Sequence, residues 1–147
     1  MKRLALVAAG ALGLAVLATG PASADTTTTV TTCGAGGLQS GLWTKACVDI
    51  TGTSVVAWGQ IGLAGPPSPG SPELQWQQLY TSLDASVVGG ASLGSSNQWT
   101  NFKASTVRVD GVSGTAACGS TVHVNFTVNG PNGWGPRTVT ADVPVNC

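Results

Sequence analysis

Apolar and polar residues alternate along the C-terminal part of the chain, between Cys118 and Cys147. The apolar members of the two runs are Val122, Val124 and Phe126, then Val139, Ala141 and Val143. A period of two predicts two β-strands, each with one apolar face. Asn132-Gly133 lies between the runs and predicts a tight hairpin turn, because a type I′ turn needs positive φ at both central residues.

Folding the chain about this dipeptide also predicts the pairing of the two strands. Val122 then faces Val143, and Phe126 faces Val139. The same register sets Cys118 opposite Cys147, although the cysteines played no part in choosing it. The turn, the alternation and the cysteines therefore predict one disulfide-bonded hairpin.

Further strands are predicted where β-branched and aromatic residues are concentrated. They cover 26–33, 43–51, 53–63 and 99–110. Gly52-Thr53 suits a type II′ turn between the second and third of these strands, which sets Cys47 opposite Trp58. In the last strand, the inward positions shift from Phe102 to Val107, which predicts a bulge near Ser105-Thr106.

The segment Leu74–Val88 carries two competing patterns. Trp76, Tyr80 and Leu83 recur at helical spacing, and Ser71-Pro72-Glu73 resembles a helix start. However, Leu79, Thr81, Leu83, Ala85 and Val87 alternate with polar residues over nine positions. We favour a strand. After it, Gly89-Gly90 predicts a turn and Ala91–Asn97 a loop or short edge strand; Asp110-Gly111 and Ser113-Gly114 predict the turn into the C-terminal hairpin.

Ala64–Glu73 contains four prolines and cannot join a sheet ladder. We interpret it as a stiff loop that crosses from one sheet to another. About seven strands separated by turn signals predict an all-β fold, an immunoglobulin-like two-sheet antiparallel β-sandwich.

Residues 1–24 have the features of a signal peptide: basic Lys2-Arg3, an apolar stretch from Leu4 to Leu17, and the small-residue cleavage site Ala22-Ser23-Ala24. The apolar stretch falls short of the ~20 residues that span a membrane. We therefore expect cleavage after Ala24 and one secreted domain, 25–147, with no membrane attachment. Its four basic and six acidic residues are not clustered, which argues against a nucleic-acid partner.

Four cysteines in an exported chain predict two disulfides. The hairpin selects Cys118–Cys147 and leaves Cys33–Cys47. A four-thiolate zinc site is disfavoured, because the spacing has no C-x-x-C element. We expect neither a metal nor another cofactor.

Two patterns resemble catalytic arrangements. Gly90-Ala-Ser92-Leu-Gly94 matches the G-x-S-x-G nucleophile elbow, but that motif needs a following helix and a parallel sheet, which the chain does not predict. His123, the sole histidine, pairs in the predicted register with Asp142 on the outer face. Such a pair serves in general-base catalysis, yet an ordinary cross-strand pair has the same form, and we favour the latter.

The five tryptophans offer a binding hypothesis. We expect Trp58 and Trp43 to be buried or to cover a disulfide. Trp134 lies at the predicted hairpin tip, where little can bury it, and an exposed indole on a rigid loop is a natural glycan or protein contact. We therefore name Trp134, Asn132 and Arg137 as candidate ligand-binding residues.

These observations favour a secreted, monomeric, non-enzymatic binding module for an extracellular protein or glycan. One alternative is an inhibitor or toxin-like effector that contacts its target through Ala64–Glu73. The other is a small hydrolase that uses Ser92 or the His123–Asp142 pair.

Overall fold

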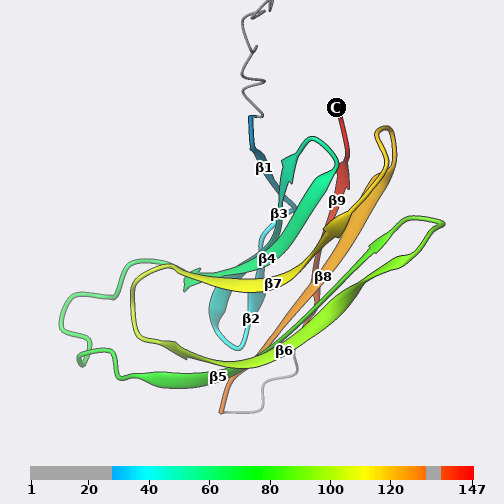
Figure 1. Cartoon of the computed structure of the whole chain (residues 1–147). Helices are drawn as coiled ribbons and strands as arrows, with labels where there is room; N and C mark the ends of the chain where they lie inside the picture. Colours follow the sequence, from blue (N-terminus) through cyan, green and yellow to red (C-terminus); the bar gives the residue numbers. More distant parts are fainter. Residues whose placement is uncertain (1–27, 132–136) are drawn as a thin grey trace, which may run out of the picture.

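The computed structural model describes residues 28–131 and 137–147, and these form a two-sheet antiparallel β-sandwich (Figure 1). The predicted all-β sandwich is confirmed, with nine strands in this part of the chain where the sequence predicted about seven. The strands are β1 (Val30–Cys33), β2 (Gly37–Gln39), β3 (Leu42–Thr51), β4 (Ser54–Leu63), β5 (Gln77–Val87), β6 (Ser92–Phe102), β7 (Val107–Thr115), β8 (Thr121–Asn129) and β9 (Val139–Pro144).

The first sheet has the strand order β1-β3-β4-β7, with β2 also pairing with β3. The second sheet has the order β6-β5-β8-β9. Figure 1 shows the long β5–β6 hairpin in green, opposite the cyan-to-yellow strands of the first sheet. The prolyl segment that follows β4 crosses between the sheets, as its composition predicted, and it is exposed from Ala64 to Glu73.

The two predicted hairpin registers are confirmed. In the C-terminal hairpin, Val122 pairs with Val143 and Phe126 with Val139. In the β3–β4 hairpin, Cys47 pairs with Trp58, and Gly52 at the turn has a φ of 59°. Leu74–Val88 contributes the strand β5 and no helix, and Leu79, Leu83 and Ala85 point into the core. Alternation thus outweighed the helical spacing, because the alternating residues are the ones that the second sheet buries.

The prediction for residues 91–114 was wrong in its boundaries. Ala91–Asn97 is not a loop, because β6 starts at Ser92 and pairs with β5 along its length. The predicted strand 99–110 is instead divided at residues 103–106 between β6 and β7, which belong to different sheets. The shift of inward positions that suggested a bulge near Ser105-Thr106 marks this crossing.

The predicted turn at Asp110-Gly111 and Ser113-Gly114 lies inside β7. A register shift occurs there, because Ala57 pairs with Val112 while the next residue, Trp58, pairs with Asp110. Gly111 is the extra residue of this bulge, and a Cβ at this position would lie 2.6 Å from a methyl carbon of Leu83. Residue 111 must therefore be glycine because the opposite sheet approaches it closely, and not because the chain turns there.

Both predicted disulfides are present. Cys33 and Cys47 are cross-strand partners in β1 and β3, and Cys118 and Cys147 join the segments that flank the C-terminal hairpin. Between the sheets, a continuous core of aliphatic side chains and two phenylalanines is fully buried, with Phe102 and Phe126 as its largest members.

Gln39 and Ser40 tie the first sheet to β8 where β9 no longer accompanies it. The buried Gln39 amide donates to the Phe126 carbonyl at 3.1 Å and accepts from the Val128 N–H at 2.9 Å. The Ser40 hydroxyl donates to the Val128 carbonyl at 3.2 Å and accepts from the Gly130 N–H at 3.0 Å. Side chains thus satisfy backbone groups that would otherwise be buried without partners. They hold the end of β8 in place.

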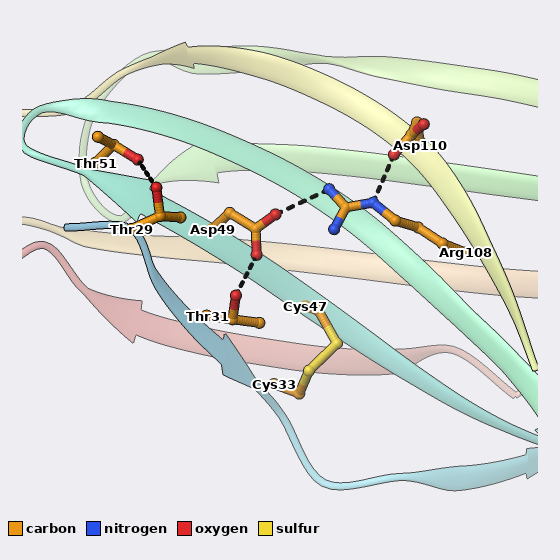
Figure 2. A network of polar contacts seen from close by, with 8 residues as sticks. All are labelled: Thr29, Thr31, Cys33, Cys47, Asp49, Thr51, Arg108 and Asp110. Atoms are coloured by element: carbon orange, nitrogen blue, oxygen red, sulfur yellow. Dashed lines mark hydrogen bonds and ion pairs between the residues drawn. A yellow bond between two sulfur atoms is a disulfide. The ribbon is translucent and has the colours of Figure 1, made fainter. Parts of the chain in front are cut away.

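A polar network covers the outer face of the first sheet (Figure 2). Asp49 accepts hydrogen bonds from Thr31 at 2.7 Å and from Arg108 at 2.9 Å, and Arg108 also binds Asp110 at 2.7 Å. The Arg108 guanidinium lies 4.1 Å from the centre of the half-buried Trp58 ring. Burial raises the pKa of Asp49, but the hydrogen bonds from Thr31 and Arg108 outweigh it and leave that pKa below its ordinary value. This network fastens the short strand β1 to β3 and β7.

Candidate binding site on the outer face of the second sheet

The outer face of the β6-β5-β8-β9 sheet is polar and carries few charges. Residues alternate strictly between this face and the core along β5 and β8. Within the described strands, its ionisable groups besides Tyr80 are Asp84, His123 and Asp142, and the remainder are mainly Ser, Thr, Asn and Gln side chains. Such a surface offers many hydrogen-bonding groups and little net charge.

Three aromatic side chains stand out at one end of this sheet. Trp76 is 71% exposed, Trp99 is 64% exposed and Tyr80 is 36% exposed. Tyr80 and Trp99 are cross-strand partners on β5 and β6, with ring centres 5.1 Å apart and planes inclined at 60°. We call these three residues the aromatic cluster. Large apolar side chains grouped on a polar surface are typical of binding sites.

The aromatic cluster borders a hollow of about 380 Å³. Gln77, Gln78 and Asn129 line the same hollow, together with Gly130 and Pro131. Of these, Gln78 and Asn129 have outer-face parity, and among the described residues neither of their side-chain amides has a hydrogen-bond partner. Ser40 holds Gly130 at the rim. The hollow therefore combines flat apolar rings with amide groups that are both donors and acceptors and are available to a ligand.

The aromatic cluster was not among the predicted sites, although the alternation along Leu74–Val88 indicated part of it. Trp76, Gln78 and Tyr80 have the parity opposite to Leu79, which the alternation assigned to the core. If Leu74–Val88 is a strand, these three residues must therefore lie on the outer face. The sequence contains no such signal for the position of Trp99 beside Tyr80. That position depends on the pairing of β5 with β6, and the first half of β6 was interpreted as a loop or short edge strand.

The predicted ligand-binding residues lie at or beyond the edges of the described chain. Trp134 and Asn132 fall outside the described residues, so their role stays a prediction. Arg137 is described and lines a different hollow, which also contains Trp43. Trp43 was predicted to be buried or to cover a disulfide; it is not buried, since it is 41% exposed. Trp43 lies near the edge of the first sheet, where β2 covers it only in part.

His123 and Asp142 form the predicted pair, with 2.7 Å between Nδ1 and Oδ1. The other ring nitrogen, Nε2, lies 3.0 Å from Oδ1 of Asn125, whose amide nitrogen donates to Asp84 at 2.8 Å. Both ring nitrogens therefore face acceptors, an arrangement that the doubly protonated imidazolium satisfies. The hydrogen bond to Asp142 raises the pKa of His123, burial lowers it less, and Asn125 and Asp84 raise it further.

We predict that His123 titrates above the ordinary value of 6.5. Because its pKa is higher in the folded protein, the imidazolium contributes stability that is complete below pH 6.5 and is lost as the pH rises through the folded pKa. An NMR titration of the imidazole protons measures the midpoint, and Asp142→Asn should lower it. A wild-type midpoint at or below 6.5 would contradict the pairing.

The residues of the hydrolase hypothesis are brought into one row across the sheet. The register aligns Ser92, Ser86, His123 and Asp142 on neighbouring strands. However, the Nε2 atom of His123 is directed at Asn125, and the hydroxyl of Ser92 accepts a hydrogen bond from the Gly94 N–H at 3.2 Å. Nε2 would have to leave Asn125 before it could accept a proton from a serine hydroxyl. This arrangement favours a structural role for the His123–Asp142 pair over a role of His123 as the base for a serine nucleophile.

In the described ranges 28–131 and 137–147, no three His, Cys, Asp or Glu side chains are grouped so that they could hold a metal ion. The same ranges contain no helix long and apolar enough to cross a membrane. Comparisons of the chain with protein-family models, with curated proteins and with solved structures found no match.

Proposed function

We propose that this protein is a secreted, non-enzymatic module that binds a neutral glycan at the aromatic cluster. The observation that carries the proposal is the grouping of the exposed rings of Trp76, Tyr80 and Trp99 beside the two unpaired amides of Gln78 and Asn129. The export proposal is supported by the two disulfides, which are typical of extracellular proteins, and by the signal-peptide features of residues 1–24.

The chemistry of the aromatic cluster matches that of a sugar ring. An indole ring offers a broad flat apolar surface on which the C–H face of a pyranose can lie. The amides of Gln78 and Asn129 are each donor and acceptor, as the sugar hydroxyls around the edge of that ring are. A site built to bind hydroxyls distinguishes its ligand from a plain apolar molecule, which would leave these amides unpaired.

The charges around the hollow favour a neutral ligand over a uronate or sulfate. The charged residues that precede Trp76 and follow β6 are Glu73 and Lys103, and they pair with each other at 2.8 Å. None of the described residues that line the hollow is charged, so the hollow itself offers no net attraction for anions. The 60° angle between the Tyr80 and Trp99 rings also disfavours a flat crystalline surface. The inclined rings suit a soluble glycan chain that changes direction between Tyr80 and Trp99.

A glycan array followed by calorimetric titration of the best ligand tests this proposal. We expect Trp99→Ala to weaken binding at least 10-fold, because stacking on an exposed aromatic ring contributes on the order of 1.4 kcal/mol or more. Trp43→Ala is the matched control: it removes another exposed indole outside the hollow and should leave glycan affinity unchanged. Unaltered thermal unfolding would show that neither variant misfolds.

Absence of binding to any neutral glycan, or equal binding by the wild type and Trp99→Ala, would refute the proposal. Trp134→Ala on the same array tests the sequence-based expectation for that residue. Inhibition of an extracellular enzyme without glycan binding would favour the effector hypothesis and its segment Ala64–Glu73. Turnover of an ester or amide substrate that disappears in His123→Ala would favour the hydrolase.

A further inference from the structure

We propose a second binding site, in the hollow between β2 and β9, for a carboxylate that is attached to an apolar side chain. The hollow has a volume of about 720 Å³ and lies where the edges of the two sheets approach each other. Residues 35–38 and Trp43 form one wall, and residues 137–140 form the other. It shares no lining residue with the hollow at the aromatic cluster.

One wall presents two large apolar side chains. Leu38 is 56% exposed and Trp43 is 41% exposed, and they are cross-strand partners on β2 and β3. The backbone of Gly36 lies so close to the Trp43 indole that a Cβ at Gly36 would collide with the ring. The contact holds the ring in place before any ligand arrives. A preformed apolar wall lowers the ordering cost of binding.

Arg137 lies on the facing wall and supplies the only charge among the described residues that line the hollow. Its side chain makes no ion pair and no hydrogen bond with another described residue. The planar guanidinium can bind a carboxylate through two parallel hydrogen bonds. A positive group opposite an indole and a leucine side chain therefore selects ligands that are anionic at one end and apolar at the other.

The shape of the hollow favours a chain end over a long extended segment. β9 is an edge strand that pairs only with β8, so its other side is open to an added backbone. Gly34 closes this edge at Thr140 and Ala141, because its Cα lies directly against their backbone. Arg137, Thr138 and Val139 line the hollow ahead of this contact. A C-terminal residue of a peptide, or a free N-acylated amino acid, has the required carboxylate and side chain.

Quenching of tryptophan fluorescence and calorimetry with three probes test this site. The probes are acetyl-Ala-Ala-Phe with a free carboxylate, the same peptide with a C-terminal amide, and N-acetylphenylalanine. We expect the free acid to bind at least 10-fold more tightly than the amide. Arg137→Gln should reduce the affinity for the acid to that for the amide, whereas Arg137→Lys should retain part of the difference.

Matched variants separate this site from the aromatic cluster. Trp43→Ala should weaken both peptides, and Trp99→Ala should change neither affinity. Binding of N-acetylphenylalanine as tight as that of the peptide acid would identify free acylated amino acids as the ligand source, and weaker binding would identify peptide ends. Equal affinities for the acid and the amide, an unaffected Arg137→Gln variant, or no binding of any probe at millimolar concentration would each overturn the proposal.

Discussion

Phe126→Ala is expected to lower the free energy of unfolding by about 3 to 5 kcal/mol, the usual range for removing a buried aromatic ring. Phe126 is fully buried on β8, between two strands that hold its backbone in register. Its ring reaches across the sandwich to Gly59 of β4, where a Cβ would collide with it. The truncation therefore leaves a cavity at the contact between the sheets. Urea or thermal denaturation measures the loss.

A second substitution makes this prediction more specific. Gly59→Ala alone should destabilise the protein by about 1 to 3 kcal/mol, because the added methyl group forces the Phe126 ring to move. In the Phe126→Ala background, the same methyl group enters vacated space, so its effect should be much smaller or stabilising. A double-mutant cycle measures this coupling. Strictly additive effects would contradict the contact between Gly59 and Phe126.

Removal of the Cys118–Cys147 disulfide, by substituting both cysteines with serine, is expected to cost about 3 to 4 kcal/mol. The bridge closes a segment of 29 residues that includes β8 and β9. In the chain-entropy model, loss of the bridge increases the conformational entropy of the unfolded chain and leaves that of the folded protein unchanged, so unfolding becomes more favourable. For a domain of this size, the loss lowers the melting temperature by roughly 10 °C or more.

The other bridge provides the comparison. Cys33–Cys47 closes only 14 residues, so the same model predicts a slightly smaller loss, about 3 kcal/mol, for its removal. Calorimetry of both double-serine variants should show the larger effect for the C-terminal bridge and a single cooperative transition in each. Detection of free thiols at Cys118 and Cys147 in folded, non-reduced protein would contradict this prediction.

The candidate sites were only partly predictable. The choice of a strand for Leu74–Val88 was enough to set Trp76 and Tyr80 on the outer face, because the parity of a strand is a local property. Exposure was not predictable in the same way. Trp43 was expected to be buried or to cover a disulfide, but it is 41% exposed beside β2, which is only three residues long. The hollow that it shares with Arg137 joins residues that are far apart in the sequence, and no local pattern connects them.

The sequence by itself determined most of the strands, the two hairpin registers and both disulfides. Each follows from a short-range rule: alternation with a period of two, a glycine at a tight turn, and cysteines that face each other once the register is set. The tertiary structure alone decided which strand joins which sheet. The shift of inward positions after Phe102 fits either a bulge or a crossing from one sheet to the other. Only the pairing of β7 with β4 distinguishes the two. It also decided that Gly34, Gly59 and Gly111 must lack side chains, because the atoms that a Cβ would meet belong to distant strands.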